Sequence, residues 1–172
     1  MKPELLALSK VEWQLFCTFT FKRERMSDAT RQRMFFALLR TQAGNFGVHF
    51  KQVIWCLRVE RGEATGRKHF HALIAGLPPH SIHEKTCFAF KNLWERLGGG
   101  MARVSVYSRL LAGADYILKG LEAVQSRHAG DFYELTKFGG SCDVTLSESI
   151  LRVIEGRRVI GQRRRPALRK AE

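Results

Sequence analysis

Two short segments with alternating polarity, joined by a glycine-containing loop, restrict the fold more than any other feature of the sequence. Residues 57–60 and 69–72 alternate between polar and apolar side chains, the flanking residues 53–56 and 73–74 are apolar, and the segment 62–66 separates the two segments. A period of two is typical of β-strands, so we predict a hairpin with a fairly long loop. Side chains alternate between the two faces of a strand, so the face of each residue can be assigned from the sequence alone.

The segments on either side of this hairpin predict a β-α-β-β-α-β order. That order is the split βαβ, or ferredoxin-like, arrangement. We therefore expect an α+β protein with an antiparallel sheet of four to five strands, two helices on one face and a third helix near the other. The predicted elements besides the hairpin are a strand at 16–21, a helix from Ser27–Asp28 to Gly44, a helix from a Ser81–Glu84 capping box to Gly98–Gly100, a strand at 102–107, a helix at 108–119 and a weakly helical stretch at 145–154.

The charge of the chain favours a polyanionic partner. The 172 residues include 29 Lys and Arg against 16 Asp and Glu, a net charge of +13. Residues 155–172 are rich in arginine, yet without them the chain keeps 22 basic and 14 acidic residues. We expect one domain at 1–154 and a basic, flexible tail at 155–172. A basic body with a basic tail indicates a polyanionic partner, although charge alone does not distinguish DNA from RNA or an acidic membrane, and a basic surface can also serve solubility alone.

The cysteines and the apolar runs predict a cytoplasmic protein. The four cysteines are widely spaced and include no Cys-x-x-Cys pair, which is typical of reduced thiols. No apolar run is long enough to span a membrane, and no secretory signal is recognisable at the N-terminus. We therefore expect no membrane partner.

Side-chain alternation gathers polar groups on one face of the predicted sheet. Two imidazoles and one carboxylate would leave open coordination positions, so we predict a catalytic metal site holding Mn²⁺, Mg²⁺, Co²⁺ or Zn²⁺. Glu63 in the hairpin loop is the substitute ligand if the register differs. The plainer alternative is a pair of half-buried histidines on a sheet. The residues on this face are Arg58, Glu60, His69, His71, Thr18 and Thr20, of which Glu60, His69 and His71 are the predicted ligands.

Three motifs together resemble the HUH endonucleases. The run from Lys68 to Ile74 resembles their histidine–hydrophobe–histidine motif. Residues 16–21 resemble the threonine-bearing first motif of their replication initiators, and residues 114–120 resemble the third motif, Tyr-x-x-Lys. Glu60, nine residues before His69, matches the third metal ligand of several members. The chain thus resembles the endonuclease domain of a single-tyrosine rolling-circle replication initiator.

The resemblance implies a metal-dependent DNA nickase. Tyr116 would be the nucleophile that forms a 5′-phosphotyrosine linkage, Lys119 would assist it, and the cofactor would be Mn²⁺ or Mg²⁺. Tyr107 and Tyr133 are the other tyrosines that could fill the nucleophile's role. The substrate would be single-stranded or hairpin origin DNA, nicked and rejoined to initiate rolling-circle replication of a plasmid, phage or virus.

The chain lacks the helicase that often follows this domain, because no Gly-x4-Gly-Lys-Ser/Thr loop is present. We expect either a fragment of a larger initiator or a small plasmid- or phage-type initiator that uses a host helicase and polymerase. It would act in a bacterial cytoplasm, or in the nucleus for a eukaryotic virus.

Five basic side chains are candidates for contacts with DNA phosphates. Phe16, Phe46 and Phe50 could stack on bases, although packing in the core is the expected role for any one of them. The five basic residues are Arg58, Arg67, Lys68, Arg103 and Arg109.

Two other functions fit parts of the pattern. A single-tyrosine HUH transposase has a similar length, but more often pairs its tyrosine with glutamine, so Lys119 favours an initiator. An RNA-recognition module shares the β-α-β-β-α-β order, but binds single strands through aromatic side chains on its open face. The predicted third strand presents His69 and His71 on that face instead.

Overall fold

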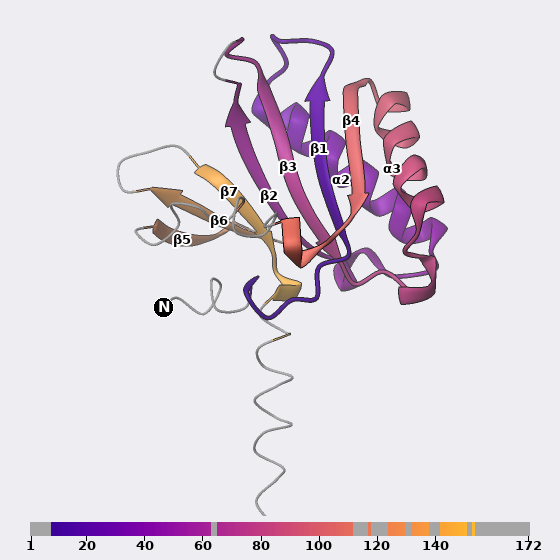
Figure 1. Cartoon of the computed structure of the whole chain (residues 1–172). Helices are drawn as coiled ribbons and strands as arrows, with labels where there is room; N and C mark the ends of the chain where they lie inside the picture. Colours follow the sequence, from indigo (N-terminus) through magenta and orange to yellow (C-terminus); the bar gives the residue numbers. More distant parts are fainter. Residues whose placement is uncertain are drawn as a thin grey trace, which may run out of the picture.

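The computed structural model describes residues 8–62, 65–111, 117, 124–129, 132–137, 142–150 and 153. Within them the chain is an α+β fold with a seven-stranded antiparallel sheet in the order β4-β1-β3-β2-β7-β6-β5 (Figure 1). The elements are β1 (Leu15–Phe21), α2 (Asp28–Asn45), β2 (Ile54–Arg61), β3 (Lys68–Ala75), α3 (Glu84–Arg96), β4 (Gly99–Val106), β5 (Val124–Ala129), β6 (Phe132–Lys137) and β7 (Cys142–Ser147), with short 3-10 turns at Phe50–Gln52, Pro79–Ser81 and Arg109–Leu111.

The elements from β1 to β4 confirm the expected β-α-β-β-α-β order. Strands β2 and β3 form the predicted hairpin, which is paired along its whole length from Ile54–Ala75 to Arg61–Lys68. Helix α2 begins where expected, because the Ser27 hydroxyl accepts a hydrogen bond of 3.2 Å from the amide of Thr30. This bond satisfies one of the amides that the start of a helix leaves without an intrahelical partner.

Strands β5, β6 and β7 extend the sheet beyond the four to five strands that the sequence predicts. The expected helix at 145–154 is wrong at its start, because residues 145–147 belong to β7. Strand β7 pairs with β2 and buries Val144, Thr145 and Leu146. Pairing satisfies the backbone groups on the second edge of β2, and this outweighs a weak local preference for helix.

The glycines after α3 have different roles from the one expected. Gly98 ends the helix with a φ of 90°, but Gly99 and Gly100 already belong to β4. The indole ring of Trp94 lies directly against Gly99, and its Nε1 donates a hydrogen bond of 2.9 Å to the Thr20 carbonyl. The fourth strand begins at Gly99, which pairs with Phe21 of β1, rather than at Ala102, and only a residue without a Cβ fits beneath the Trp94 ring at this position.

The predicted capping box at Ser81 is wrong. His83, not Ser81, is the residue that precedes α3, and its side chain makes no capping hydrogen bond. The Ser81 hydroxyl instead donates to the Pro78 carbonyl at 2.7 Å. Pro78 and Pro79 begin a 3-10 turn that includes Ser81, so Ser81 belongs to this turn and does not cap the helix.

Helices α2 and α3 cover one face of the sheet. Figure 1 shows α2 crossing behind the central strands and α3 beside β4. The main apolar core lies between them and the sheet, as the alternation of the strands predicts. Its largest buried side chains from the two layers include Phe19, Trp55, Leu57 and Phe70 of the strands and Phe35, Leu38, Phe90 and Trp94 of the helices.

A second apolar cluster lies on the opposite face of the sheet. It joins the N-terminal residues Leu8, Val11 and Trp13 to the sheet and includes Ile117. Its members in β2 and β3 lie toward the Ile54–Ala75 end of the hairpin, whereas the predicted metal ligands lie toward the other end. Its remaining buried members are Cys56, Leu73, Ala75, Val144, Leu146 and Ile150.

The contact between Gly99 and Trp94 gives a test of the fold. A methyl group on Gly99 would overlap the indole ring, so we expect Gly99→Ala to lower the free energy of unfolding by about 2–3 kcal/mol. Gly44 is the matched control, because it lies in α2 with nothing near the position of an added Cβ. Gly44→Ala should raise the free energy of unfolding by about 0.5–1 kcal/mol, since alanine favours helix. Urea denaturation measures both, and equal effects would contradict the packing described here.

Several expectations fall outside the described residues. Of the helix expected at 108–119, the structure describes a 3-10 turn at Arg109–Leu111 and a helical residue at Ile117. The tail at 155–172 and the loop residue Glu63 are also outside. No helix in the described part of the chain is long and apolar enough to cross a membrane. Three of the four cysteines, Cys17, Cys56 and Cys87, are buried free thiols.

Candidate metal centre

The register of the β2–β3 hairpin brings the three predicted ligands together. Glu60 lies directly opposite His69, and Arg58 lies opposite His71. The apolar residues between them, Val59 and Phe70, face the helices. The sheet face that the alternation predicts for Glu60, His69 and His71 is therefore the one they occupy.

The side-chain geometry of these residues suits a divalent cation. The Oε2 atom of Glu60 lies 3.6 Å from Nε2 of His69 and 3.4 Å from Nε2 of His71. One potential ligand atom from each residue lies within 4.8 Å of the others. The side chains of Glu60, His69 and His71 are 21%, 22% and 12% exposed, so the cluster is partly buried but open on one side. Glu60, His69 and His71 could thus hold a metal ion.

Hydrogen bonds to the other imidazole nitrogens hold both rings in position. Nδ1 of His71 lies 3.0 Å from the Thr18 hydroxyl, and Nδ1 of His69 lies 3.4 Å from the Arg67 carbonyl. A carbonyl only accepts, so the His69 contact requires the proton on Nδ1 and leaves the Nε2 lone pair free for a metal. Partners of this kind orient metal-binding histidines in many proteins. Phe16 adds a stacked ring, with its centroid 6.1 Å from that of His71.

Burial also favours the metal-binding form of His71. Removal from water lowers the pKa of His71, and the nearby positive charge of Arg58 acts in the same direction. The negative charge of Glu60 opposes this shift, but the net direction is downward. A lowered pKa keeps the imidazole neutral at neutral pH, and only the neutral ring offers a lone pair to a cation.

Arg58 is held by two contacts within the protein. Its Nε lies 3.1 Å from Oε1 of Glu60, and its Nη1 donates a hydrogen bond of 3.0 Å to the carbonyl oxygen of Ile117. The side chain is only 14% exposed. The structure thus places this predicted DNA contact between a metal ligand and a more distant segment of the chain.

Two of the other basic residues predicted to contact DNA, Lys68 and Arg67, form ion pairs away from the histidines. Lys68 faces the helix side, where its Nζ contacts both carboxylate oxygens of Asp28 at 2.7 and 2.6 Å. Hydrogen bonding from Lys68 lowers the pKa of Asp28. Arg67 forms an exposed ion pair with Glu24. Neither side chain joins the histidines.

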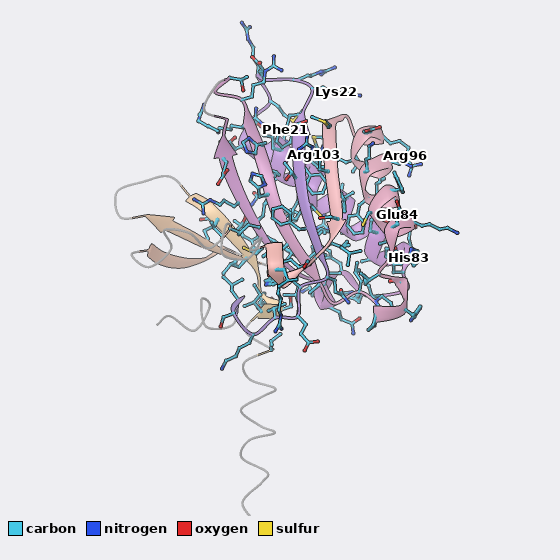
Figure 2. All side chains as sticks on the ribbon, viewed as in Figure 1. Phe21, Lys22, His83, Glu84, Arg96 and Arg103 are labelled. Carbon is cyan, nitrogen blue, oxygen red and sulfur yellow. The ribbon has the colours of Figure 1, made fainter. Side chains whose placement is uncertain are left out.

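Arg103 lies on the open face, as Arg58 does. It belongs to β4 (Figure 2) and lies opposite Thr18, which is itself opposite His71. Its side chain is exposed. Arg109 is also exposed, in the 3-10 turn that follows β4.

The predicted nucleophile, Tyr116, and its assisting residue, Lys119, lie outside the described residues. Ile117, which follows Tyr116 directly in the sequence, is fully buried, and its carbonyl is the one that Arg58 holds. The described segment nearest to the predicted nucleophile is therefore attached to the face that carries the metal ligands.

Tyr107 lies at the far end of the sheet from these ligands. Its amide donates to the Gln14 carbonyl, whereas the strand position opposite His71 is Thr18. Four residues of strand separate these levels, a distance of about 13 Å. That separation is longer than a tyrosine side chain, so the structure disfavours Tyr107 as a nucleophile at this site. The side chain of Tyr133, in β6, is not among those described.

The three aromatic candidates for base stacking also lie in different parts of the structure. Phe46 and Phe50 are partly buried against the main core, so packing accounts for both. Phe16 is the candidate on the open face, where it stacks on His71.

Thr18 is a site residue whose role the sequence does not reveal. Alternation along 16–21 places it on the open face, but its contact with His71 depends on β1 pairing with β3. The threonine-bearing strand is the sequence signal that could have suggested this role of Thr18.

Comparison with protein-family models, curated proteins and solved structures found no match to this chain.

Proposed function

We propose that this protein is a metal-dependent endonuclease that nicks and rejoins single-stranded DNA through a covalent tyrosine intermediate. The observation that carries the proposal is the cluster of Glu60, His69 and His71 on the open face of the sheet. The order of motifs along the sequence, with Tyr116 after the hairpin, supports it. The biological role that fits best is the initiation of rolling-circle replication of a plasmid, phage or virus.

The donor set leaves room for a catalytic metal. Two nitrogen ligands and one carboxylate leave coordination positions for a phosphate oxygen and water, and Mn²⁺ or Mg²⁺ is the cation that we propose. A bound cation would stabilise the charge that develops on the scissile phosphate. Thr18 and the Arg67 carbonyl would keep the two imidazoles aimed at the same point.

Tyr116 would carry out the covalent step. Its phenolic oxygen would form a bond to phosphorus while the bond from phosphorus to the 3′-oxygen breaks. The phenolic proton would end on that 3′-oxygen, which leaves a free 3′-hydroxyl and a 5′-phosphotyrosine. A later attack by a 3′-hydroxyl on the same phosphorus would reverse the reaction and rejoin the strand without ATP. Lys119 would neutralise negative charge beside the nucleophile.

The charge distribution supports a polyanionic substrate. The net charge of +13 attracts a polyanion, and Arg103 and Arg109 are exposed for contacts with the backbone. The DNA that we propose is an origin presented as a single strand or hairpin. Its replication would then need a helicase and a polymerase from the host.

The decisive experiment incubates the protein with a labelled origin-type stem–loop oligonucleotide and Mn²⁺ or Mg²⁺. We expect a nicked product together with a DNA–protein adduct that survives denaturing electrophoresis. EDTA should abolish both, and excess Mn²⁺ should restore them, because the chelator removes the cation that stabilises the phosphate charge.

The outcomes separate the alternatives. Binding without metal-dependent cleavage would indicate an RNA-recognition-like module and contradict the proposal. Nicking without an adduct would indicate hydrolysis by water and exclude a tyrosine intermediate. Adduct formation with transposon-end hairpins in preference to replication origins would favour the single-tyrosine transposase.

A further inference from the structure

We propose that Arg58 is a positioning residue that ties the metal ligand Glu60 to the chain segment that follows Tyr116. The inference deepens the proposed function and rests on it. It assigns to Arg58 an internal role in place of a contact with DNA. The proposal rests on two contacts of the Arg58 guanidinium, one with Glu60 and one with the Ile117 carbonyl.

The two oxygens of Glu60 are divided between two tasks. Oε2 points toward Nε2 of both histidines, at 3.6 and 3.4 Å. Oε1 lies 3.1 Å from Nε of Arg58. One oxygen therefore faces the metal position while the other forms an ion pair with Arg58, and this attraction favours one orientation of the carboxylate.

The second contact of Arg58 reaches a separate part of the chain. Its Nη1 donates to the Ile117 carbonyl at 3.0 Å, and 59 residues separate the two in the sequence. The Ile117 side chain is fully buried in the second apolar cluster, beside residues of β2, β3 and β7. Ile117 is therefore held twice, through its side chain by the apolar cluster and through its carbonyl by Arg58.

The chemistry of the guanidinium suits this task. Its nitrogens are coplanar and point in different directions, so one arginine can form an ion pair with a carboxylate and donate a hydrogen bond to a carbonyl at the same time. The low exposure of the side chain, 14%, shields both contacts from water. In-line attack on a phosphate needs the nucleophile and the bound phosphate at a fixed separation. Arg58 contacts both the metal ligand Glu60 and Ile117, the residue that follows Tyr116 in the sequence.

The test compares Arg58→Met, Arg58→Lys and the control Arg33→Lys. Methionine removes both contacts but keeps similar apolar bulk, and lysine keeps the charge beside Glu60 without the planar fork. Arg33 is an exposed arginine on α2, away from the metal ligands. Mn²⁺ affinity is measured by titration calorimetry, and the rate of adduct formation is measured at saturating Mn²⁺.

Loss of the two Arg58 contacts should lower the rate of adduct formation even when Mn²⁺ saturates the metal site. We expect Arg58→Met to weaken Mn²⁺ binding and to slow adduct formation at saturating Mn²⁺, each by about 10- to 100-fold. The KM for the oligonucleotide should stay unchanged, because Arg58 does not contact DNA in this arrangement. Arg58→Lys should keep most of the Mn²⁺ affinity and recover only part of the rate. Arg33→Lys should match the wild type in both.

Hydrogen exchange tests the link between Arg58 and Ile117 without relying on activity. Hydrogen exchange of the peptide that contains Ile117 should speed up in Arg58→Met but not in Arg33→Lys, since the carbonyl loses its partner. Thermal unfolding confirms that each variant is folded. If Arg58→Met misfolds, the rate of Arg58→Lys at saturating Mn²⁺ tests the proposal, because this variant keeps the charge but loses the planar group.

Each outcome bears on one proposal or the other. If Arg58→Met forms the adduct at the wild-type rate at saturating Mn²⁺, Arg58 positions Glu60 alone. That result would overturn the proposed link to Ile117. Unchanged exchange at Ile117 would overturn it as well. A raised KM with an unchanged rate would return Arg58 to the DNA interface. No adduct from the wild-type protein would contradict the proposed function, while the calorimetry and exchange results would still decide whether Arg58 links Glu60 to Ile117.

Discussion

Replacing His71 with alanine should abolish metal-dependent nicking and weaken Mn²⁺ binding by more than about 100-fold, since even residues that only orient a ligand are worth about 10- to 100-fold. The imidazole contributes one of the three potential ligand atoms, and its Nε2 faces Oε2 of Glu60 at 3.4 Å. Calorimetric titration with Mn²⁺ and the adduct assay measure the two effects. His69→Ala should behave in the same way.

The fold should survive this substitution. His71 lies on the open face, outside the core between the sheet and the helices, and its contacts there are with Thr18 and Phe16 among others. We expect a change in the free energy of unfolding of about 1–2 kcal/mol, measured by urea denaturation. His80→Ala is the matched control, because His80 is exposed in the turn before α3. Mn²⁺ affinity that is unchanged in both His71→Ala and His69→Ala would show that Glu60, His69 and His71 do not form the metal site.

The hairpin shows why this part of the site is predictable from sequence. Side-chain alternation in a strand follows from covalent geometry, so Glu60, His69 and His71 can be assigned to one face without knowing the rest of the fold. Their cross-strand register depends only on a loop that is close in sequence. Both conditions are local, and the structure confirms the result.

Contacts between distant segments could not be obtained in this way. Thr18 meets His71 because β1 pairs with β3, and Arg58 meets Ile117 across 59 residues. The basic character of Arg58 predicts an anionic partner but does not distinguish DNA from a carboxylate in the same protein. Only the three-dimensional arrangement identifies Glu60 as that partner.

Strands β5 and β6 had a local signal that can be recognised in retrospect. The dipeptide Gly130-Asp131 lies between the segments 124–129 and 132–137, and a Gly-Asp pair favours a two-residue hairpin loop. Strand β7 has no comparable signal, since its place is set by the free edge of β2. The start of β4 at Gly99 is likewise a tertiary effect, because the Trp94 ring occupies the space that a side chain would need.

Replacing Tyr116 with phenylalanine should abolish both the adduct and the nicking, while Mn²⁺ affinity and DNA binding stay at the level of the wild type. The substitution removes one hydroxyl, which is the atom that we propose as the nucleophile. The cost in the free energy of unfolding should be about 1 kcal/mol or less. Denaturing electrophoresis of the labelled oligonucleotide measures the adduct, and calorimetry measures the metal affinity.

Tyr107→Phe is the matched control for the loss of a phenol, because Tyr107 lies about 13 Å along the sheet from the level of His71. It should form the adduct at the wild-type rate. If Tyr116→Phe still forms an adduct, the nucleophile is another residue, and Tyr133 becomes the first to test. If Tyr116→Phe nicks DNA without an adduct, water is the nucleophile. In that case the energy of the broken bond is not stored in a phosphotyrosine, and strand rejoining without ATP would be lost together with the role in rolling-circle replication.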